Sequence, residues 1–134
     1  MSMESFSRAV RDVDVMVAED DKHQCDELHA FFDWSDMSHH IVNDGPSVLQ
    51  ALERFRPKVL ILDIRLPGLD GIQVAEQVAK RANPPVTVLV SGHLDSVIAA
   101  NQRRAQPFPV IEKPVSLKVL GKFIRGVLEK KPDA

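Results

Sequence analysis

The sequence lacks the features that would staple the protein covalently or place it in a membrane. Among its 134 residues there is one cysteine, Cys25, so no disulfide can form within the chain. No apolar stretch approaches the roughly 18 residues of a membrane-spanning helix, and the N-terminus lacks the apolar region of a signal peptide. We therefore expect a soluble, cytoplasmic protein without membrane insertion.

A strong charge of either sign is also missing. The 17 lysines and arginines nearly balance the 19 aspartates and glutamates, which leaves a formal net charge of −2. This balance offers no electrostatic reason for direct binding to nucleic acid or to a membrane surface. Hydrophobic residues make up 44% of the chain, enough for one domain of this length to bury its own core.

The sequence does contain five apolar runs that alternate with helical patterns. The runs predict strands near residues 14–18, 40–43, 58–62, 86–91 and 108–112. The short, partly polar second run and Pro109 in the fifth favour edge positions for these two strands. The pattern predicts an α/β fold, a (βα)5 doubly wound parallel sheet of the flavodoxin-like kind with strand order 2-1-3-4-5.

The helical patterns fill the segments between these strands. Pro46 suits the first turn of the second helix, which we expect to extend to Phe55, and Asp70 suits the cap of the third, which we expect to end at Asn83. The fourth helix is expected over 95–103 and the last over 116–130. Residues 1–12 are expected to be a flexible leader, and residues 13–131 a single domain.

Chemically active side chains follow four of the predicted strands. Glu19 and Asp20 come after the first strand and Asp63 after the third, while Ser91 and Lys113 close the fourth and fifth. Because the carboxyl ends of parallel strands meet at one edge of the sheet, we expect these groups to share one site. Three crowded carboxylates need a cation, and oxygen ligands favour Mg²⁺, with Mn²⁺ as a possible substitute.

The remaining groups of this site suit the transfer of a phosphoryl group. Lys113 would add positive charge, and the Ser91 hydroxyl would add a hydrogen-bond donor. Asp63 is then the nucleophile that we expect to form an aspartyl phosphate.

These motifs resemble the receiver domain of two-component response regulators, in its stand-alone, single-domain, CheY-like form. The matching pieces are Glu19-Asp20, Asp63 with the loop 66–71, Ser91-Gly92 and Lys113-Pro114, in an order that spans residues 13–130. The resemblance implies that Asp63 is the phosphoacceptor. Asp20 would bind the metal ion directly, Glu19 through a water molecule and Arg65 through its main-chain carbonyl. Ser91 would be the hydroxyl that turns toward the phosphoryl group, and Lys113 the lysine that pairs with it.

The resemblance also implies partners and a backbone feature. A sensor histidine kinase or a histidine phosphotransfer protein would donate the phosphoryl group. Since no output domain follows Lys131 in this sequence, the effect would pass to another protein by contact. The family also commonly has a cis peptide bond before the proline that corresponds to Pro114.

One position departs from the family, and two other functions stay open. Val110 stands where the family commonly has a switching aromatic residue. A phosphatase of the haloacid dehalogenase kind would need an aspartate where this chain has Arg65. A degenerate receiver would act only as a binding module.

Residues outside this site receive no catalytic role. We expect Cys25 to be a buried, unreactive thiol and Trp34 to pack within the fold. No zinc site is expected, because the histidines lack metal-ligand spacing; they are His23, His29, His39, His40 and His93.

Overall fold

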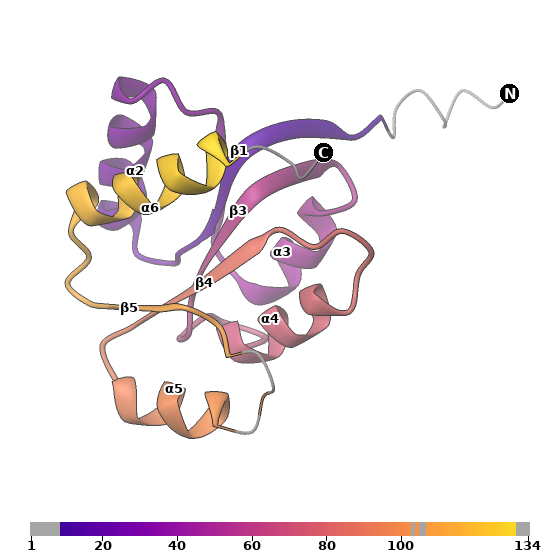
Figure 1. The fold of residues 1–134 in the computed structure, drawn as a ribbon, viewed down its shortest axis with the longest axis vertical. Helices are drawn as coiled ribbons and strands as arrows, with labels where there is room; N and C mark the ends of the chain where they lie inside the picture. Colours follow the sequence, from indigo (N-terminus) through magenta and orange to yellow (C-terminus); the bar gives the residue numbers. More distant parts are fainter. Residues whose placement is uncertain (1–8, 103, 105–106, 131–134) are drawn as a thin grey trace, which may run out of the picture.

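The fold is a parallel sheet of five strands with helices between successive strands (Figure 1). The computed structural model describes residues 9–102, 104 and 107–130. In chain order its elements are β1 (Arg11–Ala18), α2 (Lys22–Trp34), β2 (His39–Val42), α3 (Gly45–Ala51), β3 (Phe55–Asp63), α4 (Gly71–Ala79), β4 (Val86–Ser91), α5 (Leu94–Asn101), β5 (Val110–Glu112) and α6 (Leu117–Glu129). The strand order β2-β1-β3-β4-β5, with every neighbouring pair parallel, confirms the predicted fold class.

The sheet has an apolar core on each face. Alternate residues of the central strand β3 point to opposite faces, so Val59 and Ile61 enter one core while Leu60 and Leu62 enter the other. The first core packs against α2 and α6, which lie side by side in Figure 1, and the second packs against α3 and α4. Both faces of β3 are therefore dry, which explains why its sequence is an unbroken apolar run.

Four helices begin at side chains that accept a hydrogen bond from the first helical turn. A carboxylate or hydroxyl that accepts a free N–H stabilises a helix start by about 1 kcal/mol. Asp70 forms a reciprocal capping box with Gln73, which confirms the prediction that Asp70 caps this helix. The four capping residues are Asp21, Asp44, Asp70 and Ser116.

Two strands begin earlier than expected. Arg11 pairs with Phe55 and Asp12 with Arg56, so these two residues of the expected leader belong to β1; residues 1–8 lie outside the described residues. Phe55 therefore starts β3 and does not end the second helix. Pro57 lies inside β3, but ahead of the first β3–β4 partner pair, where its missing N–H breaks no ladder with β4.

Three other elements are shorter than expected. β5 begins at Val110, so Pro109 precedes it, although β5 is at the edge as predicted. α4 ends at Ala79, with Lys80 as its C-cap, so the left-handed Asn83, whose φ is 53°, lies in the loop after the helix and does not mark its end. α5 ends at Asn101, and Arg103, its expected end, lies outside the described residues.

Trp34 is 82% exposed, so the expectation that it packs within the fold is wrong. Phe32 on the same helix is fully buried. Two residues further along an α-helix a side chain points about 200° away, which turns Trp34 to the surface.

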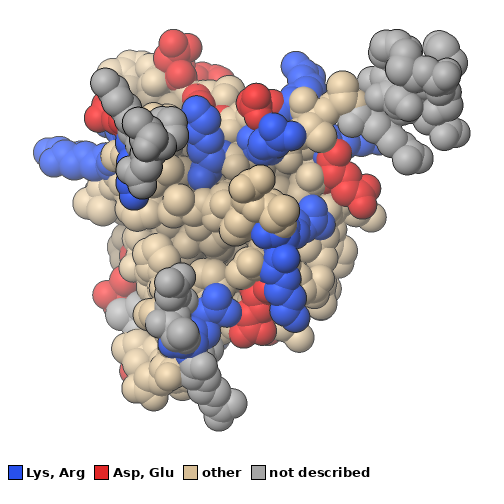
Figure 2. Space-filling view, turned by 45° about the vertical axis from the view of Figure 1, so that its right-hand side comes forward, with Lys and Arg blue, Asp and Glu red and all other residues tan. Residues whose placement is uncertain are grey.

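The surface carries charges of both signs. Figure 2 shows basic and acidic side chains interspersed over the face in view, without a region of a single sign. Of the helices in the described part of the chain, none has the length and apolar character that crossing a membrane requires.

Candidate functional site

The carboxyl ends of four strands meet at one edge of the sheet, as the sequence predicted. Asp63 is the last residue of β3 and Ser91 the last of β4, while Glu19 and Lys113 directly follow β1 and β5. These ends surround a hollow of about 380 Å³. Its lining contains every predicted site residue: Glu19, Asp20, Asp63, Arg65, Ser91 and Lys113.

Three carboxylates lie together in this hollow. Oxygen atoms of Glu19, Asp20 and Asp63 all lie within 4.8 Å of one another, with Glu19 and Asp63 buried and Asp20 exposed. Burial raises the pKa of Glu19, and the charge of Asp63 adds to the rise, although the Asp21 N–H and Lys113 oppose it. The cluster thus holds more negative charge than its surroundings favour.

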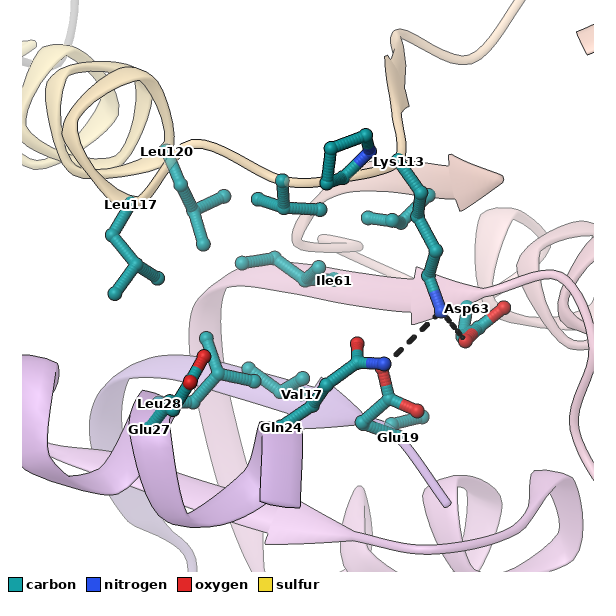
Figure 3. A pocket seen from close by; sticks show the side chains of 14 residues that line it. Val17, Glu19, Gln24, Glu27, Leu28, Ile61, Asp63, Lys113, Leu117 and Leu120 are labelled. Atoms are coloured by element: carbon teal, nitrogen blue, oxygen red, sulfur yellow. Dashed lines mark hydrogen bonds and ion pairs between the residues drawn. The ribbon is translucent and has the colours of Figure 1, made fainter. Parts of the chain in front are cut away.

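Lys113 supplies the nearest positive charge. Its Nζ lies 2.5 Å from Oδ2 of Asp63 and 3.5 Å from Oε1 of Glu19, and Figure 3 shows it reaching across to both carboxylates. Burial alone would lower the pKa of Lys113, but the hydrogen bonds and charges of Asp63 and Glu19 outweigh burial and raise it. The ammonium therefore stays protonated beside Asp63 at neutral pH.

The second oxygen of Asp63 is held by the loop after β3. The N–H of Arg65 donates to Oδ1 of Asp63 at 3.0 Å. Behind the strand end, a Cβ added to Gly71 would lie 2.4 Å from the carbonyl oxygen of Asp63. The absence of a side chain at Gly71 thus lets the start of α4 pack against the backbone of Asp63. Separately, Arg65 and Lys113 each hold one oxygen of the Asp63 carboxylate.

Ser91 is buried on the wall of the same hollow. Its Oγ accepts a hydrogen bond from the His93 N–H at 2.8 Å, and its carbonyl accepts one from the Lys113 N–H at 2.9 Å. The bond between Lys113 and Pro114 is cis, as the resemblance implied. The backbone of β4 thus links the hydroxyl and the lysine of the site.

The donor set fits a hard divalent cation. Three carboxylates from two strand ends, one exposed and two buried, provide oxygen ligands on one side of the hollow. Such ligands are those of Mg²⁺ or Mn²⁺. Glu19, Asp20 and Asp63 could hold the ion; the use of the Arg65 carbonyl as a further ligand stays a prediction.

Asn43 supports the acidic turn and received no role from the sequence. Its Nδ2 donates to the carbonyl oxygen of Glu19 at 3.0 Å, and the Cys25 thiol donates to the same oxygen at 3.3 Å. The only signal in the sequence was that Asn43 ends the second predicted strand, at the same edge of the sheet. Cys25 is buried, as predicted, and burial raises the pKa of its thiol, which favours the protonated form.

A second, mostly apolar cavity of about 510 Å³ opens next to the carboxylates. It lies between α2 and α6, where Leu28, Leu117 and Leu120 line its walls (Figure 3). Glu19, Asp63 and Lys113 line both cavities, so the apolar cavity adjoins the hollow at these charged side chains.

Comparison with known proteins agrees with this geometry. The positive alginate biosynthesis regulatory protein of Pseudomonas aeruginosa is 32% identical over 83 residues, which cover 62% of this chain and 33% of that protein. The sensory transduction protein RegX3 of Mycolicibacterium smegmatis is 30% identical over 121 residues, which cover 89% of this chain and 52% of that protein. The chain thus spans about half or less of the length of these curated relatives.

A solved structure and a family model point the same way. The BeF3-activated receiver domain of nitrogen regulatory protein C is 26% identical, with a TM-score of 0.71, and the match covers 89% of this chain and 96% of that one. Residues 15–125 match the sequence model of the response regulator receiver domain. The protein therefore belongs to the response regulator receiver domain family.

Proposed function

We propose that this chain is a phosphorylation-dependent signalling switch of a two-component system, with Asp63 as the phosphoacceptor in a single domain whose first strand starts at Arg11. The observation that carries the proposal is the position of the Asp63 carboxylate. It is buried at the floor of an open hollow, between an acidic cluster and the ammonium of Lys113.

A histidine kinase or a histidine phosphotransfer protein would be the physiological donor, in the cytoplasm. An oxygen of Asp63 attacks the phosphorus of the donor phosphohistidine. The P–N bond breaks, and its electron pair stays on the departing imidazole. Arg65 and Lys113 orient the two carboxylate oxygens beforehand, which reduces the entropy lost on reaching the attack geometry.

Charge balance in this reaction depends on the residues around Asp63. Bound Mg²⁺, held by Glu19, Asp20, Asp63 and the Arg65 carbonyl, would supply positive charge against the carboxylates and the phosphoryl oxygens. Lys113 would exchange its contact with the Asp63 carboxylate for one with a phosphoryl oxygen.

Ser91 connects this reaction to α5. The Ser91 Oγ now accepts the N–H of His93, and His93, the residue before α5, has no side-chain capping bond. If the hydroxyl turns to the phosphoryl group, His93 loses its acceptor and the start of α5 is released. This route needs no aromatic switch at Val110, which is half-buried, and it would change the surface that a downstream protein contacts.

The test is incubation with a small phosphodonor, such as acetyl phosphate, and Mg²⁺, followed by intact mass measurement. Wild-type protein should gain one phosphoryl group, and Asp63→Asn should gain none. Asp70→Asn is a matched control, because Asp70 is an exposed helix cap outside the hollow and asparagine caps equally well. No mass gain in wild type, or an equal gain in Asp63→Asn, would show that the proposal is wrong.

Neither alternative gains a supporting observation. The exposed Arg65 stands where a haloacid dehalogenase-type phosphatase needs an acid, and the family match is to a receiver domain. A purely binding role requires no ordered Asp63–Lys113 pair. Phosphatase turnover far beyond one equivalent per chain would restore the first alternative, and an absence of Mg²⁺ binding the second.

A further inference from the structure

Two histidines from different elements, His29 and His39, meet on the surface between α2 and β2. Nδ1 of His29 lies 2.8 Å from Nε2 of His39, and the ring centroids are 5.0 Å apart. His29 is an exposed residue of α2, and His39 is the half-buried first residue of β2. The sequence spacing indicated no metal site, but the fold joins these two imidazoles.

The hydrogen bonds of His39 determine which of its nitrogens is free. Its Nδ1 lies 3.0 Å from the carbonyl oxygen of Met37, which can only accept, so Nδ1 carries the proton. In the neutral ring Nε2 then has the lone pair, and it points at His29. A backbone carbonyl that holds the other ring N–H is the usual support of a metal-binding histidine.

We propose that Nδ1 of His29 and Nε2 of His39 form a second metal site, for a transition-metal ion such as Zn²⁺, Ni²⁺ or Cu²⁺. In the neutral pair the bridging proton lies on Nδ1 of His29. On binding, that proton moves to Nε2 of the same ring, so both bridging nitrogens present lone pairs and no proton is released. Imidazole suits these ions, whereas Mg²⁺ prefers the oxygen ligands of the acidic hollow.

To hold an ion, the two nitrogens must separate slightly and the His29 ring must turn, so that both lone pairs point at the ion and no longer at each other. Metal–nitrogen bonds of about 2.0–2.1 Å at a tetrahedral angle separate two ligand nitrogens by roughly 3.3 Å. The nitrogens of His29 and His39 must therefore move apart by a few tenths of an ångström. His29 is exposed and can turn, whereas His39 packs against the buried ring of Phe32, with centroids 5.2 Å apart, and gives the site a fixed half.

Two imidazoles define the strength and the effect of this site. Within the described residues the acidic cluster is the only group of three or more metal-ligating side chains, so water would complete the shell at the histidine pair. We expect reversible binding that ties α2 to β2. An ion bound only by the folded chain raises its stability by mass action.

The experiment is calorimetric titration of Zn²⁺ into tag-free, chelator-stripped protein in excess Mg²⁺. Wild type should bind one Zn²⁺ per chain, and its melting temperature should rise with Zn²⁺. His29→Gln and His39→Gln should each weaken binding by roughly tenfold or more, because either change removes one arm of the chelate. His23→Gln, a change at another exposed histidine of α2, should bind as wild type does.

Several outcomes would overturn the proposal. The proposal is wrong if wild type binds no Zn²⁺, if His29→Gln binds it as well as wild type does, or if His23→Gln weakens binding as much as His29→Gln does. In the first case the pair would be a proton-bridged packing contact. His29→Gln decides the case, because an exposed position leaves folding intact, which circular dichroism would confirm. Asp63→Asn should keep the site, so failure here is separate from failure of the phosphoacceptor proposal.

Discussion

At the scale of single residues, Glu19 shows the conflict between stability and binding most clearly. Its carboxylate is buried beside Asp63, and Lys113 lies closer to Asp63 than to Glu19. The pKa of Glu19 is raised, chiefly by burial. A raised acid pKa means that its favourable contribution to folding is present below the unfolded pKa and is lost as the pH rises through the folded one.

We therefore predict that Glu19→Gln stabilises the metal-free protein at neutral pH. Glutamine keeps the shape and can still accept the Asp21 N–H, which donates to Glu19 at 3.1 Å, but it removes the buried charge. The free energy of unfolding in urea with chelator should rise by about 0.5–2 kcal/mol, while Mg²⁺ affinity in a titration should fall. A less stable variant, or unchanged Mg²⁺ binding, would contradict the role of Glu19.

The site residues were predictable because each ends a recognisable strand. Glu19, Asp63 and Lys113 follow apolar runs, and parallel strands bring their carboxyl ends together. Asn43 and Trp34 were not predictable in this way. The contact of Asn43 depends on the path of the turn after β1, and the exposure of Trp34 depends on which face of α2 meets the sheet.

At the scale of elements, the connection from β3 to α4 holds Asp63 in position. The N–H of Gly71 donates to the carbonyl of Ile64 at 2.9 Å, and the Asp70 cap starts the helix directly behind the strand end. This close approach leaves no room for a side chain at Gly71. Gly126 in α6, by contrast, is exposed, and beyond its own helix backbone no atom of the described residues lies within 4 Å of an added Cβ.

The two glycines give a matched pair of predictions for alanine. Gly71→Ala should lower the free energy of unfolding by about 1–3 kcal/mol, because the methyl group would collide with the Asp63 carbonyl. Gly126→Ala should raise it by about 0.5–1 kcal/mol, since alanine favours the helix and meets nothing. Urea unfolding of both variants checks the signs, and a neutral Gly71→Ala would show that the loop can shift.

The types of the elements followed from periodicity, and their ends depended on neighbours. The apolar run predicted a third strand that starts near residue 58, but β3 starts at Phe55 and runs through Pro57, because β1 pairs with that part of the strand. β5 is shorter than its apolar run because only Val110, Ile111 and Glu112 pair with β4. Boundaries of this kind depend on the pairing of two strands, so the sequence of neither strand alone predicts them.

At the scale of the whole molecule, the site exists only in the folded chain. Glu19 and Asp20 belong to the end of β1 and Asp63 to the end of β3, which are neighbours in the sheet but distant in sequence. The unfolded chain cannot present these carboxylates together. Binding of a divalent cation is therefore coupled to the stability of the entire domain.

We predict that Mg²⁺ raises the melting temperature of the protein and that chelator reverses the effect. At a concentration one hundred times its dissociation constant, the ion would add about 2.7 kcal/mol to the free energy of unfolding. Asp20→Asn is the informative variant, because this exposed carboxylate contributes to the cluster without being buried. Its melting temperature should respond much less, and an equal response would place the ion elsewhere.

The periodicity and the residues at strand ends were enough to predict the parallel fold and the acids, hydroxyl and lysine of one site. The hydrophobic pattern and the twist of parallel strands are properties of the whole chain, so the sequence alone is enough to predict the fold that they favour. The His29–His39 contact, the bond from His93 to Ser91 and the exposure of Trp34 required the tertiary structure. Each depends on how a helix is rotated or a loop is closed, and packing between distant segments decides both.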